Sequence, residues 1–228
     1  TDGGLLEQPQ TLNDIHLAPA ERADIIVDVS DGKTLSLQNK KGYGNLNTGM
    51  MSMMGGNSDL DSNFDLFHID ASKAGKVAAF NTTKLVSLPD WSNVDIATTR
   101  RLQLDMQMGP AMMFGSGGFA INKNEYDMNV INEVAKANTF EVWELHNPSI
   151  THHPIHVHNT QFRILDRNGR PPYSWENGLK DTVTVYTDEK VRILVPTGPY
   201  KDAKMPYMYH CHILEHEDAG MMGQFTVT

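Results

Sequence analysis

The sequence predicts an all-β protein, a Greek-key sandwich or barrel that follows the end of another domain. From residue 98 onward, short runs rich in β-branched and aromatic residues alternate with turn residues, a pattern typical of such folds. The composition agrees, because 39% of the 228 residues are hydrophobic, which suits one large globular domain or one and a half ordinary ones. No apolar run approaches the roughly 18 residues of a membrane span.

The C-terminal domain is expected to cover residues 73–228, and its strands can be placed individually. They are predicted at Thr98–Met106, Glu141–His146, Gln161–Leu165, Thr182–Tyr186, Val191–Val195, Tyr207–Cys211 and Gly223–Val227.

Residues 1–72 are predicted to be the closing part of the preceding domain plus a linker, with the boundary near Ser72. Strands are expected at residues 1–7 and 21–29. The Asp31-Gly32 turn then predicts a hairpin that pairs 21–29 with Thr34–Leu37. Residues 64–69 are expected to form the last strand before the boundary.

The most informative segment lies near the C-terminus. Cys211, the one cysteine of the chain, stands between His210 and His212 and is followed by His216 and Met221. A cysteine, two histidines and a weak axial methionine form the ligand set of a blue-copper site. Successive side chains of a strand face opposite ways, so Cys211 and its two neighbours should serve metals on different faces. Such a strand is expected to conduct electrons from one metal to the others.

A second segment supplies further histidines. His156 and His158 are two residues apart and should share one face of a strand. His153 precedes Pro154, which is expected to break the strand and let His153 point elsewhere. His152 has no place in the pattern, and we assign it no role.

Together the two segments resemble the multicopper oxidases, in which a His-Pro-x-His-x-His segment pairs with a His-Cys-His-x3-His-x4-Met segment. The likeness is to the bacterial laccase-like and cuprous-oxidase branch, and it extends to residues 2–7, 20–22, 160–162, 180–183 and 215–218. It implies cupredoxin-like domains, with 1–72 ending the second and 73–228 forming the third, catalytic one. It also implies a copper-dependent oxidoreductase that takes electrons from phenols, aromatic amines or metal ions and reduces O2 to water.

The resemblance assigns ligands by motif position. The type 1 copper would take the four residues of the blue-copper set: His153, Cys211, His216 and Met221. The type 2 copper would take His156, and the type 3 pair would take the three remaining histidines: His158, His210 and His212.

Protons are also needed for O2 reduction, and Glu217 follows His216 directly. In similar oxidases a glutamate at this place relays protons to the copper cluster, so Glu217 is the candidate proton donor. A solvated surface carboxylate is the simpler alternative. Asp218 is assigned a supporting or structural role.

A trinuclear copper cluster of this family needs twice as many histidines as the four that this chain offers in pattern. The resemblance places the others in an earlier domain. We therefore expect the type 1 site to be complete in this chain, and the type 2 and type 3 sites to be shared with an N-terminal portion of the same oxidase.

Two other classes compete with an oxidase. A single-copper cupredoxin-type electron-transfer module needs the four type 1 ligands but has no use for the other four histidines. A copper-free structural relative would have lost ligands, whereas each motif position is filled here. A Cys-His nucleophile is disfavoured, because a catalytic thiol requires neither Met221 nor a second histidine segment.

Methionines gather in two further places. Those within residues 50–54 lie in a Gly-, Asn- and Ser-rich stretch, where a flexible loop is favoured over a Cu(I)-delivery patch. Those within residues 106–113 lie where the cuprous-oxidase relatives carry a longer methionine-rich insertion. The corresponding stretch of this chain is short, which argues against a dedicated cuprous oxidase and for a site open to organic substrates.

Charge and terminal sequence bear on partners and location. The net charge of −9 argues against a nucleic-acid partner. Residues 1–4 lack the positive charge of a signal peptide, and no apolar run follows them. The single cysteine forms no internal disulfide and, as a copper ligand, leaves the compartment open. A periplasmic or extracellular location is implied by the resemblance alone.

Overall fold

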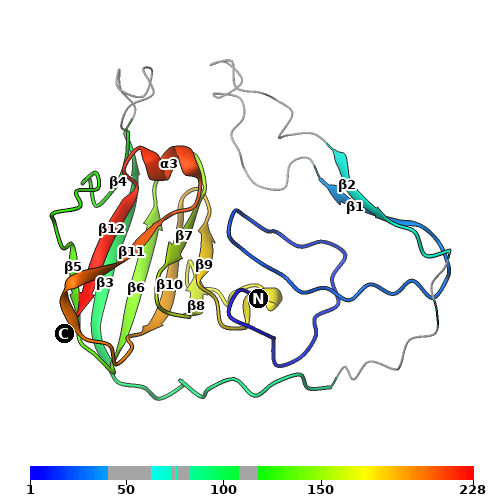
Figure 1. The fold of residues 1–228 in the computed structure, drawn as a ribbon, viewed down its shortest axis with the longest axis horizontal. Helices are drawn as coiled ribbons and strands as arrows, with labels where there is room; N and C mark the ends of the chain where they lie inside the picture. The colour runs from blue at the N-terminus through cyan, green and yellow to red at the C-terminus, as the bar shows by residue number, and fades with distance from the viewer. Residues whose placement is uncertain (41–62, 73–74, 76–82, 108–117) are drawn as a thin grey trace.

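The protein is described by a computed structural model over residues 1–40, 63–72, 75, 83–107 and 118–228. Two five-stranded sheets pack face to face, and a two-stranded sheet lies apart from them (Figure 1). The prediction of an all-β sandwich is confirmed.

The first sheet has the strand order β4-β3-β6-β10-β8. Its β3 and β6 run parallel, while β10 lies antiparallel between β6 and β8. The bounds in this order are β4 (Phe119–Ile121), β3 (Ile96–Met106), β6 (Phe140–Asn147), β10 (Glu189–Pro196) and β8 (Arg163–Arg167).

The second sheet has the strand order β5-β12-β11-β7-β9 and carries both histidine segments. Its β5 and β12 are parallel and the other pairs antiparallel. The bounds in this order are β5 (Glu133–Ala135), β12 (Met222–Val227), β11 (Asp202–Cys211), β7 (His153–Val157) and β9 (Thr182–Val185).

The core lies between these sheets and follows from strand alternation. Ile155 and Val157 on β7 are fully buried, as are Val183 and Val185 on β9. Trp143 of the opposite sheet packs edge-on against aromatic rings of β11 and β12 at centroid distances of 5.4 and 5.6 Å. Side chains two residues apart thus face one apolar interior, which fixes the directions of the residues between them.

Each strand expected in the C-terminal domain forms, with ends shifted by up to five residues. The short strands β4 and β5 were not expected. Neither were the 3₁₀ turn η2 (Ser174–Glu176) and the helix α3 (Leu214–Asp218). Segments this short carry too few residues to show a periodicity.

The expectations for residues 1–39 are partly wrong. The segments 1–7 and 21–29 are not strands, and β1 (Leu35–Asn39) pairs with β2 (Phe64–Ile69), not with 21–29. Within 21–29, Ile25 is 55% and Ile26 67% exposed. A strand requires a neighbour for its backbone hydrogen bonds, and the described residues offer this segment none. The strand at 64–69 is confirmed.

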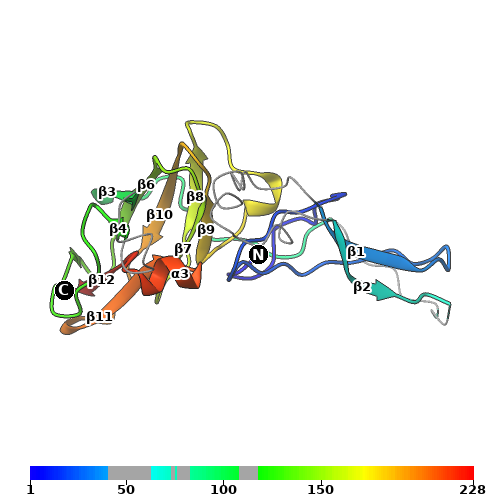
Figure 2. The same ribbon diagram turned by 90° about the horizontal axis from the view of Figure 1, so that it is seen from above.

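The N-terminal coil instead packs against the segment that leads into β9 (Figures 1 and 2). The Gly3 N–H donates to Leu179 O at 2.8 Å, and a Cβ at Gly3 would lie only 2.7 Å from Leu179. The buried ammonium of Lys180 lies 3.0 Å from Asp2 and 3.2 Å from Glu21. The β1–β2 sheet projects away from the sandwich in both views.

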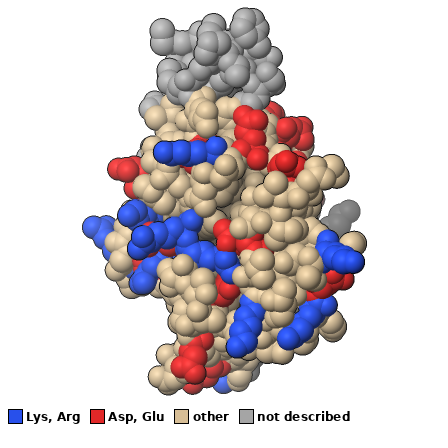
Figure 3. Space-filling model, turned by 90° about the vertical axis from the view of Figure 1, so that its left-hand side faces the viewer, with Lys and Arg blue, Asp and Glu red and all other residues tan. Residues whose placement is uncertain are grey.

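Several sequence-based expectations fall outside the described residues. These are the methionines of 50–54 and, from the second cluster, Met108, Met112 and Met113; Met106 ends β3. The boundary near Ser72 adjoins undescribed residues and stays a prediction. Within the described parts we find no helix with the length and apolar character of a membrane span. On the side shown in Figure 3, acidic and basic side chains are intermixed among uncharged ones.

Candidate metal centre

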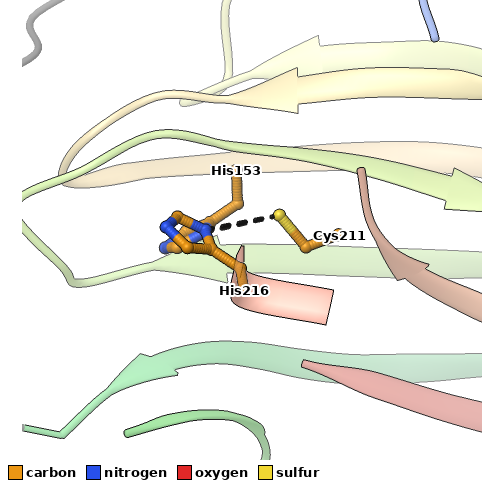
Figure 4. A group of neighbouring side chains, drawn as sticks. All are labelled: His153, Cys211 and His216. Carbon is orange, nitrogen blue, oxygen red and sulfur yellow. Dashed lines mark hydrogen bonds between the residues drawn. The ribbon is translucent and has the colours of Figure 1, made fainter. Parts of the chain in front are cut away.

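His153, Cys211 and His216 converge at one end of the sandwich (Figure 4). The Cys211 Sγ lies 3.5 Å from His216 Nδ1 and 3.8 Å from His153 Nδ1, and the two Nδ1 atoms are 3.0 Å apart. All three residues are buried. Two imidazole nitrogens and one sulfur at these separations can surround a single ion.

Strand alternation aims His153 at this site. On β7, His153 faces the same way as Ile155 and Val157, and all three are fully buried. The expectation that Pro154 breaks the strand is wrong: Pro154 lies within β7, and its carbonyl accepts the His212 N–H at 2.7 Å. The pairing of β11 with β7 begins at Ile155, so Pro154 precedes that part of the ladder and its missing N–H is tolerated. His153 and His156 therefore diverge because odd and even positions face opposite ways.

The chain turns back on itself to bring His216 and Met221 to Cys211. Helix α3 supplies His216 and ends before Gly220, whose φ of +102° suits glycine. The Met221 N–H then donates to His216 O, and the Cys211 N–H donates to Met221 O, both at 3.0 Å. Met221 is fully buried. These backbone bonds hold three of the four expected type 1 residues next to one another.

Burial keeps these donors neutral when no ion is bound. It raises the pKa of the Cys211 thiol to about 12. Burial also lowers the pKa of His216 to about 4 and, together with the nearby His216, lowers that of His153 to about 2. A cation would reverse the preference of the thiol, because a coordinating sulfur is deprotonated.

A hydrogen-bond chain fixes which nitrogen of His153 faces the site. The Ser149 Oγ donates to Asn147 Oδ1 at 2.6 Å, so its oxygen can accept from His153 Nε2 at 2.9 Å. The unprotonated Nδ1 of His153 then faces the site, 3.0 Å from His216 Nδ1 and 3.8 Å from Cys211 Sγ. Phe119 covers His216 with a stacked ring at 3.9 Å. An oriented, dry set of two nitrogen donors and one sulfur donor fits copper.

Four more histidines gather on the opposite face of β7 and β11. Their ring centroids are 5.0 Å apart for His156 and His158, 5.3 Å for His158 and His210, and 5.3 Å for His210 and His212. The Nε2 atoms of His158 and His210 are 3.2 Å apart. His210 donates through Nδ1 to Cys211 O at 3.0 Å, which leaves its Nε2 unprotonated toward the cluster.

Glu217 lies at the edge of this cluster. Its Oε1 is 3.9 Å from His210 Nδ1, and its side chain is only partly exposed. Asp218 ends α3. His152 points away from the pattern: its ring packs near Tyr186 at 6.3 Å, and its Nδ1 is buried without a hydrogen-bond partner among the described residues.

The residues that orient the histidines were not predicted from the sequence. Asn147, Ser149 and Phe119 were not singled out, although Asn147-Pro148-Ser149 reads as a turn shortly before His153. Arg22 and Asp181 lie in family-like segments to which no catalytic role was assigned. They form a bidentate pair beside His156, with nitrogen–oxygen distances of 2.7 and 2.6 Å.

Comparison with known proteins identifies the family. Residues 93–228 match the family model described as multicopper oxidase. The chain belongs to the multicopper oxidase family.

Among curated multicopper oxidases and related proteins, a laccase of Bacillus subtilis is 33% identical over all of this chain, which covers 45% of that protein. A multicopper oxidase of Staphylococcus haemolyticus is 31% identical, again over all of this chain and 42% of its own length. The solved structure of a laccase-like multicopper oxidase from Ochrobactrum sp. is 30% identical with a TM-score of 0.77, covering 100% of this chain and 49% of that one. The sandwich is therefore cupredoxin-like, and the chain spans about half the length of these relatives.

Proposed function

We propose that this chain is the C-terminal, copper-binding portion of a laccase-like multicopper oxidase. When bound, the coppers would supply one-electron oxidation of a reductant at a type 1 centre and four-electron reduction of O2 to water at a trinuclear centre. The observation that carries the proposal is the arrangement of two donor sets on opposite faces of β7 and β11. A hydrogen bond from His210 Nδ1 to Cys211 O joins the two donor sets.

On the inner face, His153, His216 and the Cys211 thiolate would hold the type 1 copper. Met221 would supply a weak thioether donor, since it is buried and tied through its backbone to both Cys211 and His216. Ser149 keeps His153 in the tautomer that this role requires. The type 1 site is complete within this chain in our proposal.

On the outer face, His156 would bind the type 2 copper and the other three histidines the type 3 pair. The four rings lie close together but number half of what such a cluster needs. We assign the remaining ligands to an N-terminal portion, in keeping with relatives about twice as long as this chain.

Glu217 is the proposed proton donor, with Cys211 as the electron conduit. The carboxyl lies within one water-mediated step of the cluster, given its 3.9 Å distance from His210 Nδ1. Its partial exposure allows exchange of protons with solvent.

A small organic reductant is the proposed substrate class. Relatives include a bilirubin oxidase of Albifimbria verrucaria, 31% identical, and the structure whose oxidase acts on lignin model compounds. We propose phenols or aromatic amines ahead of Cu(I) or Fe(II), and a periplasmic or extracellular location.

Counting copper in the intact protein tests the proposal. An oxidase binds four coppers, shows the blue thiolate band and consumes O2 with a phenolic dye. A single copper with a blue band and no O2 uptake would indicate the electron-transfer module. No copper would indicate a structural relative.

A further inference from the structure

Arg22 reaches across the fold to Asp181, a hydrogen-bond partner of His156. Its guanidinium donates to both carboxylate oxygens of Asp181, at 2.7 and 2.6 Å. Three more hydrogen bonds hold Arg22 in place. Its guanidinium donates to Ala20 O at 2.7 Å and to Asp2 O at 2.8 Å, and its backbone N–H donates to Asp2 Oδ1 at 2.7 Å. The N-terminal coil and the start of β9 are thus locked together at this point.

Stability alone does not explain the pair. The Arg22 side chain is 51% exposed, and ion pairs this open to solvent contribute about 0–1 kcal/mol. A bidentate geometry nonetheless fixes the carboxylate in one orientation. Asp181 in turn contacts His156, so its orientation affects that ring.

Asp181 and Thr182 hold the ring of His156. Thr182 Oγ donates to Asp181 Oδ1 at 2.9 Å, so only its lone pairs are available to His156 Nδ1, 3.1 Å away. The Asp181 carbonyl, at 2.9 Å from the same Nδ1, can also only accept. His156 must therefore carry its proton on Nδ1, which leaves Nε2 free for a metal.

We infer that Arg22 and Asp181 are positioning residues for His156, clamping the acceptors that aim its Nε2 at the type 2 copper. The inference rests on the proposed function and adds to it a role for the N-terminal coil. If Arg22 is lost, the Asp181 carboxylate is no longer paired. It lies 3.6 Å from His156 Nδ1 and can then accept the hydrogen bond from the Nδ1–H group in place of the present acceptors. The ring then turns, and Thr182 loses the bond that orients its hydroxyl.

The copper-loaded protein, including its N-terminal portion, provides the test. We expect Arg22→Gln and Asp181→Asn each to release the type 2 copper to a chelator 10–100-fold more readily, the usual effect of losing such a supporting residue. Type 2 electron paramagnetic resonance and copper content report this, while the type 1 blue band should persist as an internal control for folding. Arg22→Lys should retain more type 2 copper than Arg22→Gln but less than the parent, since lysine cannot form the bidentate pair.

Two comparisons make the result specific. The double variant Arg22→Gln/Asp181→Asn should lose no more type 2 copper than either single variant, because Arg22 acts through Asp181. Arg192→Gln breaks a similarly exposed pair with Asp166, in the other sheet, and should leave type 2 copper unchanged. Parental type 2 retention in both single variants, or equal loss in Arg192→Gln, would overturn the inference.

A copper-free measurement separates this inference from the proposed function. Nitrogen-15 NMR of the apo protein should show His156 protonated at Nδ1; a dominant Nε2–H form would overturn the positioning role. A parent without any type 2 copper would contradict the proposed function instead, and the NMR result would still decide the tautomer.

Discussion

His210 donates its Nδ1–H to the carbonyl oxygen of Cys211 at 3.0 Å, so neighbouring residues with opposite side-chain directions are also joined by a hydrogen bond. Cys211 faces the buried donor set that it forms with His153 and His216, and His210 faces the four-histidine cluster. In the proposed oxidase, an electron leaving the sulfur would have a route to the cluster through a few covalent bonds or across this hydrogen bond. The same strand thus supports both halves of the proposed reaction.

Replacing the thiol should remove the blue centre. In Cys211→Ser we expect no intense blue absorption and no oxidase turnover, because a hydroxyl is too hard and too weakly acidic to replace a thiolate. His152→Gln is the matched control, since His152 adjoins His153 but lies outside the donor set, and it should keep the band. Retention of the band in Cys211→Ser would falsify the assignment of Cys211.

Met221→Leu should keep the blue colour and raise the type 1 reduction potential. A thioether is a weak donor that stabilises Cu(II), and leucine fills similar buried space without donating. If Cu(II) loses about 1–2 kcal/mol of stabilisation, the reduction potential of this one-electron couple rises by on the order of 50–100 mV. Redox titration of the blue band measures this, and a lower potential would argue against Met221 as axial ligand.

The two histidine segments could be predicted from sequence because strand alternation has a fixed period. The alternation that sends Cys211 inward sends His210 and His212 outward, and the spacing of His156 and His158 works the same way. Pro154 misled the prediction for His153, because its ring suggested a break, whereas it precedes the pairing of β11 with β7 and its missing N–H is tolerated there. Alternation alone was sufficient.

Long-range partners could not be predicted in this way. Arg22 and Asp181 are 159 residues apart, and Phe119 reaches His216 from a three-residue strand. No local period encodes such contacts. The N-terminal hairpin failed for a related reason: a turn signal at Asp31-Gly32 does not say which strand supplies the neighbour, and β1 pairs with β2 instead.

Copper-free protein should lose stability as the pH falls below 6.5. Burial lowers the folded-state pKa of His216 to about 4 and of His153 to about 2, so the unfolded chain takes up protons first. The free energy of unfolding is therefore highest above pH 6.5. As the pH falls from 6.5 toward the folded-state pKa values, it declines by roughly 1.4 kcal/mol per pH unit for each histidine.

Denaturant unfolding between pH 7 and 4.5 measures this slope. His216→Gln removes one of the two titrating groups and should flatten the curve, whereas His68→Gln, on the exposed strand β2, should leave it unchanged. A parent whose unfolding free energy is constant over this range contradicts the neutral burial of the two rings.

Glu217→Gln should separate electron delivery from proton delivery. Glutamine keeps nearly the same shape but cannot donate a carboxyl proton, so reduction of the type 1 copper by a phenol should survive while steady-state O2 consumption falls, by the 10²–10⁴-fold typical of a lost proton donor. Glu215→Gln, two residues earlier on the same helix, is the matched control. Equal O2 consumption in parent and Glu217→Gln across pH 5 to 8 would rule out the relay.

Residues 1–228 purified alone should bind a type 1 copper but reduce no O2. The donor set of His153, Cys211 and His216 is assembled within this chain, whereas the outer cluster has only four rings from β7, β11 and the residues that follow each strand. The isolated chain should also self-associate, because apolar side chains of its N-terminal part are exposed, to 67% for Ile26 and 55% for Leu66. Adding the N-terminal portion should restore four coppers and suppress the association. Four coppers and full O2-reducing activity in residues 1–228 by themselves would show that the trinuclear site is not shared.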